Sequence, residues 1–359
     1  MSPNEGATLL PIIDLDLYLN LRDDSTHPLL IKECQKAVNA LKEYGLLIVK
    51  DSRVTEEDNY QFLNLMEDYY AQPTEIKLKD ARPEIGYNVG ITPEYIETPR
   101  CQRDPKCESI ITNMPEEIRP KISTGPDSKW RYFWPIGSTP KETKFPKFYN
   151  GPIIPEKFEN VWEEVMNKWG NQMHQAIKGI AEMIAIGFGL PRNTLTDLTQ
   201  DGPHILAPTG SDLNIYGKLN TILAGFHYDL DFLTIHGKSR YPGLNIWPRD
   251  RSSKIPVQVP NGCLLVQAGK QLEWVTAGEI LAGYHEVIVT EATLKAIEEA
   301  KRNKPDRPLW RVSSTFFFHI ASDNKLKTLE PFKPNSEVYP AIYAGDQVRN
   351  EYEFIDLMK

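Results

Sequence analysis

Apolar and polar positions in the first part of the chain predict two helices separated by short strands. Between Pro28 and Gly45, apolar residues recur at helical spacing, and Pro and Gly suit the first turn and the C-terminal cap of a helix. The run LPIIDLDLYL before this helix and the run LLIVKD after it are predicted strands. A second helix is expected from Thr55, as its N-cap, to about Ala71. Residues 82–155 are rich in Pro, Gly and aromatic side chains, which indicates long ordered loops with short strands.

The second part of the chain changes from one long helix to many short strands. An apolar stripe predicts a helix that ends near Gly187 and backs the core, with Val161, Val165, Trp169, Met173, Ile177, Ile180 and Ile184 on its buried face. After about Asp201, β-type runs are separated by Gly, Pro and Asn: ILAP, LNIY, FLTIHG, GLNIWP, VQVP, CLLVQAG, LEWVT, VIVT and SSTFFFHI. Many short strands in sequence predict a mainly β fold, a sandwich or barrel, with flanking helices.

Composition narrows the class of protein. The chain has 359 residues, of which 40% are hydrophobic and 25% charged, as in ordinary soluble globular proteins. Its net charge of −8 argues against a nucleic-acid binder, which needs a basic face. No apolar stretch is long enough to span a bilayer, and the first residues, MSPNEGATLLPIIDL, lack the basic and apolar regions of a signal peptide. We expect a cytoplasmic protein, a monomer, with neither nucleic acid nor membrane as a partner.

The cysteines do not form a disulfide framework in so long a chain. There are four, at Cys34, Cys101, Cys107 and Cys263. The spacing of Cys101 and Cys107 is compatible with half of a zinc site, but no matching half is present. We therefore expect free thiols in a reducing cytoplasm.

The run HYDLDFLTIHG contains the most informative pair of residues. On a strand, His227 and Asp229 project to the same side, because side chains alternate between the two faces. An imidazole and a carboxylate held side by side are two legs of the 2-His-1-carboxylate facial triad, which binds non-haem Fe(II). His285, in the run LAGYHEVIVT beside another β-rich segment, is the expected third leg.

Arg311 and Ser313 supply a second part of this chemistry. Three ligands on one face of an octahedral iron leave three positions open, of which a 2-oxo acid can chelate two and O2 can take the last. The remote carboxylate of the oxo acid needs a cationic anchor, and the planar fork of Arg311 pairs both oxygens at once. Ser313, two residues further along the same strand face, can add a hydroxyl donor.

Each element also has a structural interpretation. A lone His-x-Asp or Arg-x-Ser occurs often by chance, and most histidines are satisfied surface or core residues. We place five histidines in that class: His27, His174, His204, His236 and His319. The order, spacing and strand context of His227 and His285 set these two apart.

In the order of these elements the chain resembles the isopenicillin-N-synthase-like branch of the Fe(II)/2-oxoglutarate-dependent dioxygenases. The resemblance covers most of the chain, from PIIDLD, ALKEYGLLIVK and the pair Gly86-Tyr87 to FHYDLDFLTIHGKSRYPGLNIW and VQVPNGCLLVQAGKQLEWVTAGEILAGYHEV. It implies a double-stranded β-helix (jelly-roll) core with flanking helices. The implied organisation is an N-terminal region of the non-haem dioxygenases at 1–150, a core-backing helix at 151–200, the jelly-roll oxygenase core at 201–325 and a C-terminal segment at 326–359.

The resemblance also implies the ligand set, residue by residue. Iron would be bound by His227, Asp229 and His285, and 2-oxoglutarate by Arg311, Ser313, Tyr216 and Asn214. The implied cofactors are Fe(II), 2-oxoglutarate as cosubstrate and O2, with ascorbate as a supporting reductant. No catalytic residue beyond the metal site is assigned.

The chain departs from the family pattern at several positions. The gap between His285 and Arg311 is longer than usual, and residues 290–308 (TEATLKAIEEAKRNKPDRP) predict an inserted charged helix, more readily a solvated decoration than a lid. Glu286 stands where the family usually has Arg, and Asp231 where it commonly has a small residue. GFGLPRNTLTDLTQDGPH is similar to a stretch of bacterial ethylene-forming enzymes in the same branch, but ILAPTGSDLN lacks their arginines, which indicates kinship without a shared activity.

These features predict an oxidoreductase of specialised metabolism that converts 2-oxoglutarate to succinate and CO2. The coupled reaction would be hydroxylation, desaturation or oxidative cyclisation of a small, amino-acid-derived metabolite. Candidate substrate residues are Asp231, through a positive group such as an amine, with Phe318 and Tyr132 as pocket walls. If the strand ends after Asp229, Asp231 caps a turn instead.

Three alternatives stay open at this point. One is a catalytically silent jelly-roll protein that binds a small molecule. Another is an oxidase or ethylene-forming relative with a different outcome, including kainoid-type cyclisation. The third is a zinc hydrolase, which would leave Arg311 and Ser313 without a role.

Overall fold

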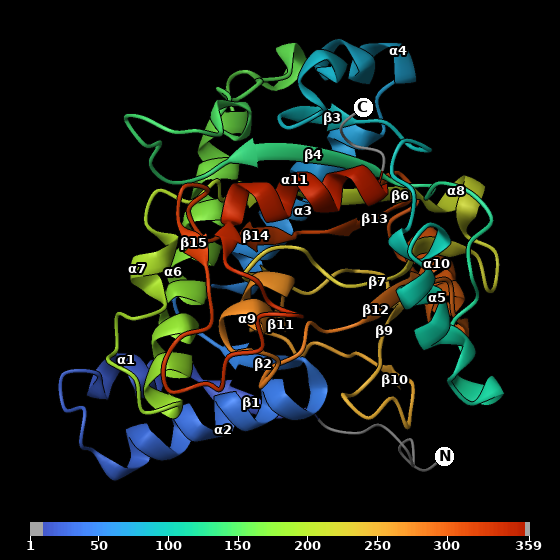
Figure 1. Ribbon diagram of the computed structural model, residues 1–359. Helices are drawn as coiled ribbons and strands as arrows, with labels where there is room; N and C mark the ends of the chain where they lie inside the picture. The colour runs from blue at the N-terminus through green and yellow to red at the C-terminus, as the bar shows by residue number, and fades with distance from the viewer. Residues whose placement is uncertain (1–9, 356–359) are drawn as a thin grey trace.

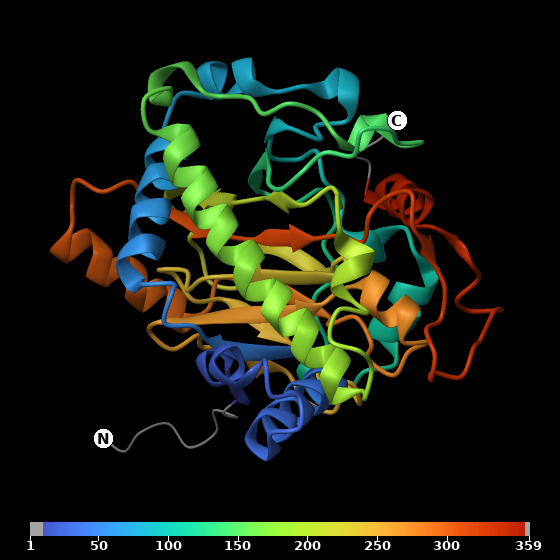
Figure 2. The same cartoon turned by 90° about the vertical axis from the view of Figure 1, so that its left-hand side faces the viewer.

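A long helix crossing a large sheet organises the structure (Figures 1 and 2). The computed structural model describes residues 10–355, and within this range ten strands form one mixed sheet. Helix α6 (Trp162–Gly187) runs obliquely over one face of that sheet in Figure 2. In sheet order the strands are β1 (Ile12–Asp14), β2 (Leu46–Lys50), β11 (Cys263–Ala268), β8 (Leu233–His236), β14 (Phe316–Phe318), β5 (Ile205–Leu206), β4 (Trp130–Pro135), β6 (Thr209–Asp212) and β13 (Trp310–Ser313), with β3 (Gly90–Thr92) paired to β4.

A smaller antiparallel sheet carries two of the candidate metal ligands, His227 and His285. Its order within the described residues is β10 (Ile255–Pro256), β9 (Leu244–Ile246), β12 (His285–Ile288) and β7 (Ile222–His227). A further pair is formed by β15 (Lys325–Leu326) and β16 (Ile342–Tyr343). The fold is thus two main sheets with flanking helices, in agreement with the mainly β prediction.

The flanking helices begin and end where local sequence signals place them. They are α1 (Leu15–Leu21), α2 (Pro28–Tyr44), α3 (Glu56–Tyr70), α4 (Thr74–Lys77), α5 (Pro105–Thr112), α7 (Thr196–Thr199), α8 (Leu213–Tyr216), α9 (Lys270–Val275), α10 (Glu291–Asn303) and α11 (Ala344–Ile355). The predicted helix from Pro28 is confirmed, and Gly45 ends it with a φ of 69°, where a Cβ would lie 2.7 Å from Gly283 Cα. The helix after Thr55 is also confirmed, with Thr55 and Asp58 forming a capping box.

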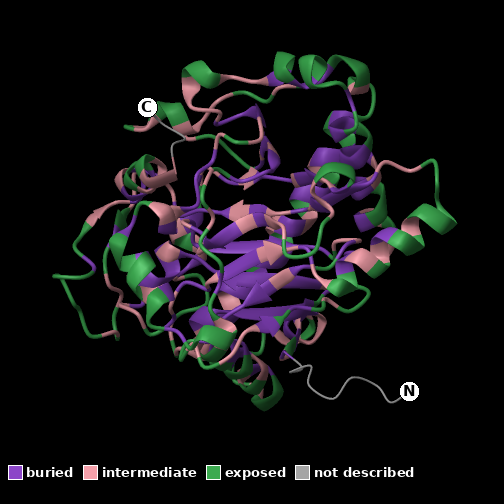
Figure 3. Ribbon diagram, turned by 90° about the vertical axis from the view of Figure 1, so that its right-hand side faces the viewer, coloured by how far each residue is buried: buried purple, intermediate pink, exposed green. Residues whose placement is uncertain are grey.

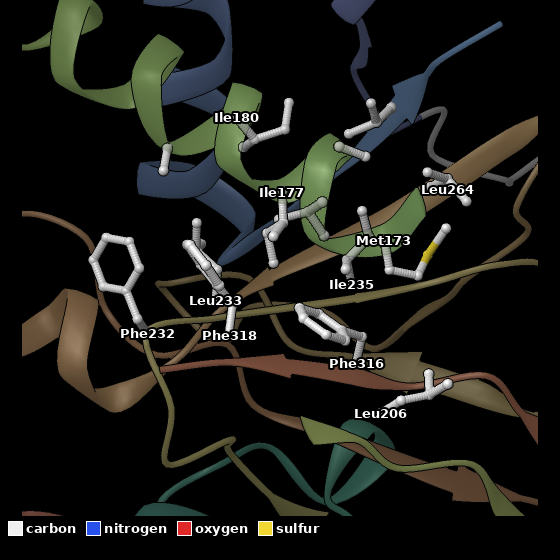
Figure 4. Packing of buried hydrophobic residues seen from close by; sticks show 14 of the residues in the cluster. Met173, Ile177, Ile180, Leu206, Phe232, Leu233, Ile235, Leu264, Phe316 and Phe318 are labelled. Carbon is white, nitrogen blue, oxygen red and sulfur yellow. The ribbon is translucent and has the colours of Figure 1, made fainter. Parts of the chain in front are cut away.

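The core lies between α6 and the large sheet (Figure 4). From Val165 to Ile184 the apolar stripe predicted for α6 is buried and faces the strands beneath, whereas Val161, which precedes the helix, is exposed. Figure 4 shows Met173, Ile177 and Ile180 of α6 above Leu233 and Ile235 of β8 and Phe316 and Phe318 of β14. Figure 3 shows the same division by burial, with the strands largely buried and the outer helices exposed.

Several short segments differ from their predicted structure. LNIY and LEWVT, expected as strands, lie in helices α8 and α9. Asp212 caps α8 by accepting a hydrogen bond of 2.8 Å from the backbone N–H of Asn214. LPIIDLDLYL is a strand only at Ile12–Asp14, because the Asp14 side chain caps α1 by accepting from the N–H of Leu17. VQVP was expected as a strand, but β10 lies just before it. Apolar runs this short are compatible with strand and helix alike.

The insertion between the two core strands is helical, as predicted. A capping box at Thr290 begins α10, and its buried Ile297 packs in one cluster with Leu213 and Leu309. Figure 3 shows α10 at the edge of the molecule with its outer face exposed. Glu286, where the family usually has Arg, is buried and pairs with Lys254. The insertion therefore packs on the body and lies outside the cavities described below.

One expectation about the cysteines is wrong. Cys101 and Cys107 are joined as a disulfide, with their Cα atoms 4.9 Å apart. The two residues lie close together because Cys101 is in a 3-10 turn and Cys107 is in α5, which follows it directly. Cys34 and Cys263 are free.

The helices were compared with the length and apolarity that a membrane span requires. Within residues 10–355, none is both long enough and apolar enough to cross a bilayer. The amino-terminal stretch considered for a signal peptide begins in residues 1–9, which lie outside the described residues.

Shortening a side chain beneath α6 tests the packing of the core. Ile177 is completely buried, so Ile177→Ala should lower the free energy of unfolding by about 2–5 kcal/mol through lost contacts and a cavity. Denaturant titration measures this loss. Gln175→Ala on the exposed face of the same helix is the control and should change stability little. Equal effects of both substitutions would contradict the assigned core.

Candidate metal centre and adjoining cavities

Two neighbouring strands bring the histidines of the predicted triad together. His227 ends β7, His285 begins β12, and the two residues are direct partners in the antiparallel pair. Their ring centroids lie 4.2 Å apart. The Nε2 atom of each ring lies 3.9 Å from Oδ1 of Asp229, and the three potential ligand atoms lie within 4.8 Å of one another. This spacing suits a single metal ion bound by all three side chains.

Backbone carbonyls orient both imidazole rings. Nδ1 of His227 donates to the carbonyl of Gly225 at 2.6 Å, and Nδ1 of His285 donates to the carbonyl of Gly283 at 3.1 Å. Because a carbonyl oxygen only accepts, Nδ1 carries the hydrogen and the lone pair of Nε2 faces the centre. Burial, followed by the charge of His285, holds the pKa of His227 well below its usual value. Both rings are therefore oriented with Nε2 toward the centre, and the neutral form of His227 is favoured.

Asp229 reaches the centre from a turn and not from the strand. Strand β7 ends at His227, so Asp229 lies just beyond the strand on which it was predicted, although its side chain meets that of His227 as expected. The carboxylate is held instead by Thr234, whose hydroxyl donates to Oδ2 at 2.7 Å. The other oxygen, Oδ1, faces the two histidines. A hydrogen-bonded carboxylate of this kind has a fixed orientation before any metal binds.

Asp231 lies in the protein interior and not in a cavity. It is fully buried, accepts a hydrogen bond from the N–H of Phe318 at 3.0 Å, and has its Oδ1 atom 3.1 Å from the Thr234 hydroxyl oxygen. Burial, and then the nearby charge of Asp229, raises the pKa of Asp231 well above its usual range. The expectation that Asp231 meets a positive group of a substrate is therefore wrong. The strand ends before it, and the side chain ties the turn to β14.

One cavity beside the triad is lined by Arg311 and Ser313. Arg311 is buried, and its Nε has no hydrogen-bond partner within the described part of the chain. Burial lowers the pKa of Arg311 to about 10, so the side chain is still cationic at neutral pH. Ser313 shares a hydrogen bond of 2.8 Å with Thr315 on the same wall. A buried cation with an unsatisfied N–H fits a carboxylate guest.

The two remaining predicted cosubstrate contacts lie outside this cavity. Asn214 is exposed on α8, and the Tyr216 hydroxyl bonds to Glu94 at 2.8 Å and to Tyr95 at 2.5 Å. The helix turns both side chains away from the wall that a strand would have presented.

Strand β6 supplies the wall in their place. Ser211 and Thr209 line the cavity, and they are the register partners of Arg311 and Ser313 in β13. Sequence reasoning missed both residues, although they lie directly before LNIY. The polar alternation in TGSD was the available signal.

A second cavity meets the first at the triad. Arg131, His227, Asp229 and Phe317 line both, so the potential metal site lies between them. Helix α11 forms part of the wall of the second cavity through Val348, Glu351, Tyr352 and Ile355. Glu351 holds this helix in place through an ion pair with Arg100. The arrangement provides one cavity with an anion anchor and another with a helical wall.

The two aromatic residues predicted to line the substrate pocket, Phe318 and Tyr132, do not line this second cavity, but their neighbours in sequence do. Phe318 and Tyr132 are completely buried in the core, and the Tyr132 hydroxyl donates to the carbonyl of Ile153. Their strand neighbours Phe317, Arg131 and Phe133 line the cavity instead. Alternation along β14 and β4 places neighbouring residues on opposite faces, which explains the error.

The other histidines divide into two groups. His27 caps α2, and His174 and His204 pack against core aromatic residues, as expected of structural histidines. His236 and His319 are also buried, but each lines a cavity: His236 the one with Arg311, and His319 the one with α11.

Solved structures share this fold at low sequence identity. A full-length Neurospora crassa protein in complex with alpha-KG superimposes with a TM-score of 0.72 and 17% identity, covering 98% of each chain. The rice dioxygenase for auxin oxidation has a TM-score of 0.65 and 16% identity over 96% of this chain and 95% of its own. JOX2 in complex with 2OG, Fe and JA has a TM-score of 0.62 and 17% identity over 96% and 85%. No family model matches the chain, and no curated protein matches it. The chain thus has the fold of iron- and 2-oxoglutarate-dependent oxygenases.

The hydroxyl of Thr234 gives a test of the metal centre. Thr234→Val removes the donor to Asp229 at nearly constant volume, so affinity for a divalent metal should fall roughly 10- to 100-fold. Titration with Co(II), followed by its visible absorption, measures the affinity. Thr234→Ser keeps the hydroxyl and should stay close to wild type. Unchanged affinity in the valine variant would show that this hydrogen bond does not support the metal.

Proposed function

We propose that the protein is an Fe(II)/2-oxoglutarate-dependent dioxygenase of the isopenicillin-N-synthase-like branch. It would couple conversion of 2-oxoglutarate to succinate and CO2 to oxidation of a small organic molecule. The observation that carries this proposal is the buried, incompletely paired Arg311 in a cavity that opens on the His227, Asp229 and His285 cluster. A zinc hydrolase or a silent binding protein would leave that charge without a purpose.

The chain's own residues would fix both small groups. His227, Asp229 and His285 would hold the iron, with their orientation set by Gly225, Thr234 and Gly283 as described. When bound, Fe(II) with 2-oxoglutarate and O2 supplies the oxidising power that attacks a C–H bond of the substrate.

Arg311 and Ser313 would bind the remote carboxylate of 2-oxoglutarate. The guanidinium offers two parallel N–H donors, and Ser211 and Thr209 on the paired strand add hydroxyls to the same wall. This set replaces Asn214 and Tyr216 of the sequence prediction. Because the cavity ends at the triad, the opposite end of the bound oxo acid would reach the metal.

The finer architecture is part of the same proposal. We infer that the two main sheets form the two halves of a double-stranded β-helix, centred on residues 201–325. Residues 1–150 and 326–359 would then flank the core, and 151–200 would back it. The opposed sheets and the location of the triad at the smaller one support this assignment.

The prime substrate would occupy the cavity walled by α11. The structures of similar fold include the Neurospora crassa protein in complex with thymine and JOX2 in complex with JA. The outcome would be hydroxylation, desaturation or oxidative cyclisation, as proposed from the sequence. The sequence-based reason for an amine-bearing, amino-acid-derived substrate no longer holds, because Asp231 lies outside the cavity.

Removal of a ligand tests the iron and cosubstrate together. Anaerobic addition of Fe(II) and 2-oxoglutarate should give the weak visible charge-transfer band of a chelated oxo acid. His227→Ala and His285→Ala should each abolish the band, because each deletes one of three ligands. His27→Ala, at a half-buried histidine that lines neither cavity, is the control. Retention of the band in both ligand variants would refute the assignment of the triad.

The anchor prediction separates charge from geometry. Arg311→Lys keeps a cation and loses the fork, so affinity for 2-oxoglutarate should fall by about tenfold. Arg311→Leu leaves the carboxylate unpaired, and affinity should fall by roughly a hundredfold or more. Anaerobic titration of the band with 2-oxoglutarate measures both. Wild-type affinity in the leucine variant would place the cosubstrate elsewhere.

A further inference from the structure

Four charged side chains form a compact group on the wall of the cavity that meets α11. Lys129 Nζ lies 3.0 Å from Oε2 of Glu97 and 2.7 Å from Oδ2 of Asp127. Arg131 reaches the same Oε2 of Glu97 at 3.0 Å. All four residues line the cavity, and Arg131 also borders the cavity of Arg311. We call Glu97, Asp127, Lys129 and Arg131 the charged group.

One carboxylate oxygen of the charged group, Oε1 of Glu97, has no hydrogen-bond partner among the described residues. Both oxygens of Asp127 are satisfied, because Oδ1 accepts from the N–H of Gly225 at 3.0 Å and Oδ2 pairs with Lys129. On Glu97, Oε2 takes both cations, whereas Oε1 is buried with no hydrogen-bond partner among residues 10–355. Leaving a buried carboxylate oxygen unsatisfied costs stability, so its place in a cavity wall points to a guest that donates to it.

A second unsatisfied atom lies in the wall of the same cavity. Nδ1 of His319 is buried and has no hydrogen-bond partner in the described part of the chain. Burial lowers the pKa of His319 to about 3, so its ring is neutral and offers one donor and one acceptor. The other walls are largely apolar and include the aromatic rings of Phe133, Phe148 and Phe317, on which a flat body can stack. The cavity therefore suits a flat body with few polar atoms.

The charge balance of the group decides which donor fits. Two cations face two anions, so the group as a whole is neutral. Because the group has no net charge, neither an ammonium nor a carboxylate on the guest gains a net attraction that would offset the loss of its hydration. A neutral N–H or O–H donor pairs with Glu97 Oε1 and avoids this loss.

We propose that the prime substrate is an uncharged, flat molecule with an N–H or O–H donor, and that Glu97 accepts that hydrogen bond. Glu97 would thus determine specificity, and Lys129 and Arg131 would hold its carboxylate in position. This inference rests on the proposed function, since it assigns the cavity on the far side of the triad from Arg311 to the substrate.

Four probes with one phenyl body test the proposal. They are benzamide (neutral N–H donor), N,N-dimethylbenzamide (no donor), benzylamine (ammonium) and benzoate (carboxylate). Affinity is measured by calorimetry on the full chain with Fe(II) and 2-oxoglutarate under anaerobic conditions. Benzamide should bind about tenfold more tightly than each of the others, the value of a hydrogen bond to a charged acceptor. Equal affinity for benzamide and its dimethyl derivative, or no binding of any probe, would overturn the proposal.

Variants of Glu97 supply the matched comparison. Glu97→Gln removes one of the two anions beside Lys129 and Arg131, so preference should move from benzamide toward benzoate. Glu117→Gln, the same change at an exposed position, should keep the wild-type order. If Glu97→Gln does not fold, as judged by circular dichroism, Glu97→Asp keeps the charge and withdraws the oxygen, and should lose the preference for benzamide. An unchanged order in the folded variant would contradict the role of Glu97.

The same samples separate this inference from the function on which it rests. The charge-transfer band of the anaerobic complex reports iron and 2-oxoglutarate and does not depend on Glu97. A band of wild-type strength with no discrimination among the probes would refute the inference and leave the proposed function standing. Absence of the band in wild type would refute the proposed function itself.

Discussion

The direct pairing of His227 with His285 across β7 and β12 is the constraint on which the centre depends. Their register places the two rings 4.2 Å apart and leaves Asp229 to close the set from the following turn. A slip of one residue between these strands would send one imidazole to the opposite face of the sheet. The pairing of His285 with Ile246 of β9 on the other side holds the register, because β12 is then fixed by two neighbours.

Polar groups are buried around this centre in two different ways. Asp231 is held by the backbone N–H of Phe318 and by its contact with the Thr234 hydroxyl, and it ties the turn to β14. Arg311 and Glu97 are incompletely satisfied, and each lines a cavity on a different side of the triad. An unsatisfied buried charge lowers stability, so such residues persist where a guest completes them. Stability without ligands is thereby exchanged for selectivity on both sides.

Long patterns and chemistry-bearing residues were predictable from the sequence, whereas short segments were not. The helix from Pro28, the stripe of α6 and the convergence of His227 with His285 follow from periodicity and from residue type at a given spacing. LNIY and LEWVT are too short for periodicity to decide, and a capping Asp212 or a preceding Gly269 makes them helices. Because LNIY was expected to be a strand, the cavity wall formed by β6 was not predicted. Along β4 and β14 the predicted wall residues were wrong by one position, so residues of the core were named in place of their neighbours that line the cavity.

The two cavities draw their walls from different parts of the chain. The one with Arg311 is built from strands of the two sheets, whereas helix α11 closes the other and is attached through Gln347, which donates to the carbonyl of Leu230, and through the pair of Glu351 with Arg100. Substitutions on the inner face of α11 can therefore alter which molecules are admitted and leave the strands around the triad untouched. Divergence in the shape of the second cavity can therefore proceed through a single helix, while the strands that carry the two histidines of the triad stay the same.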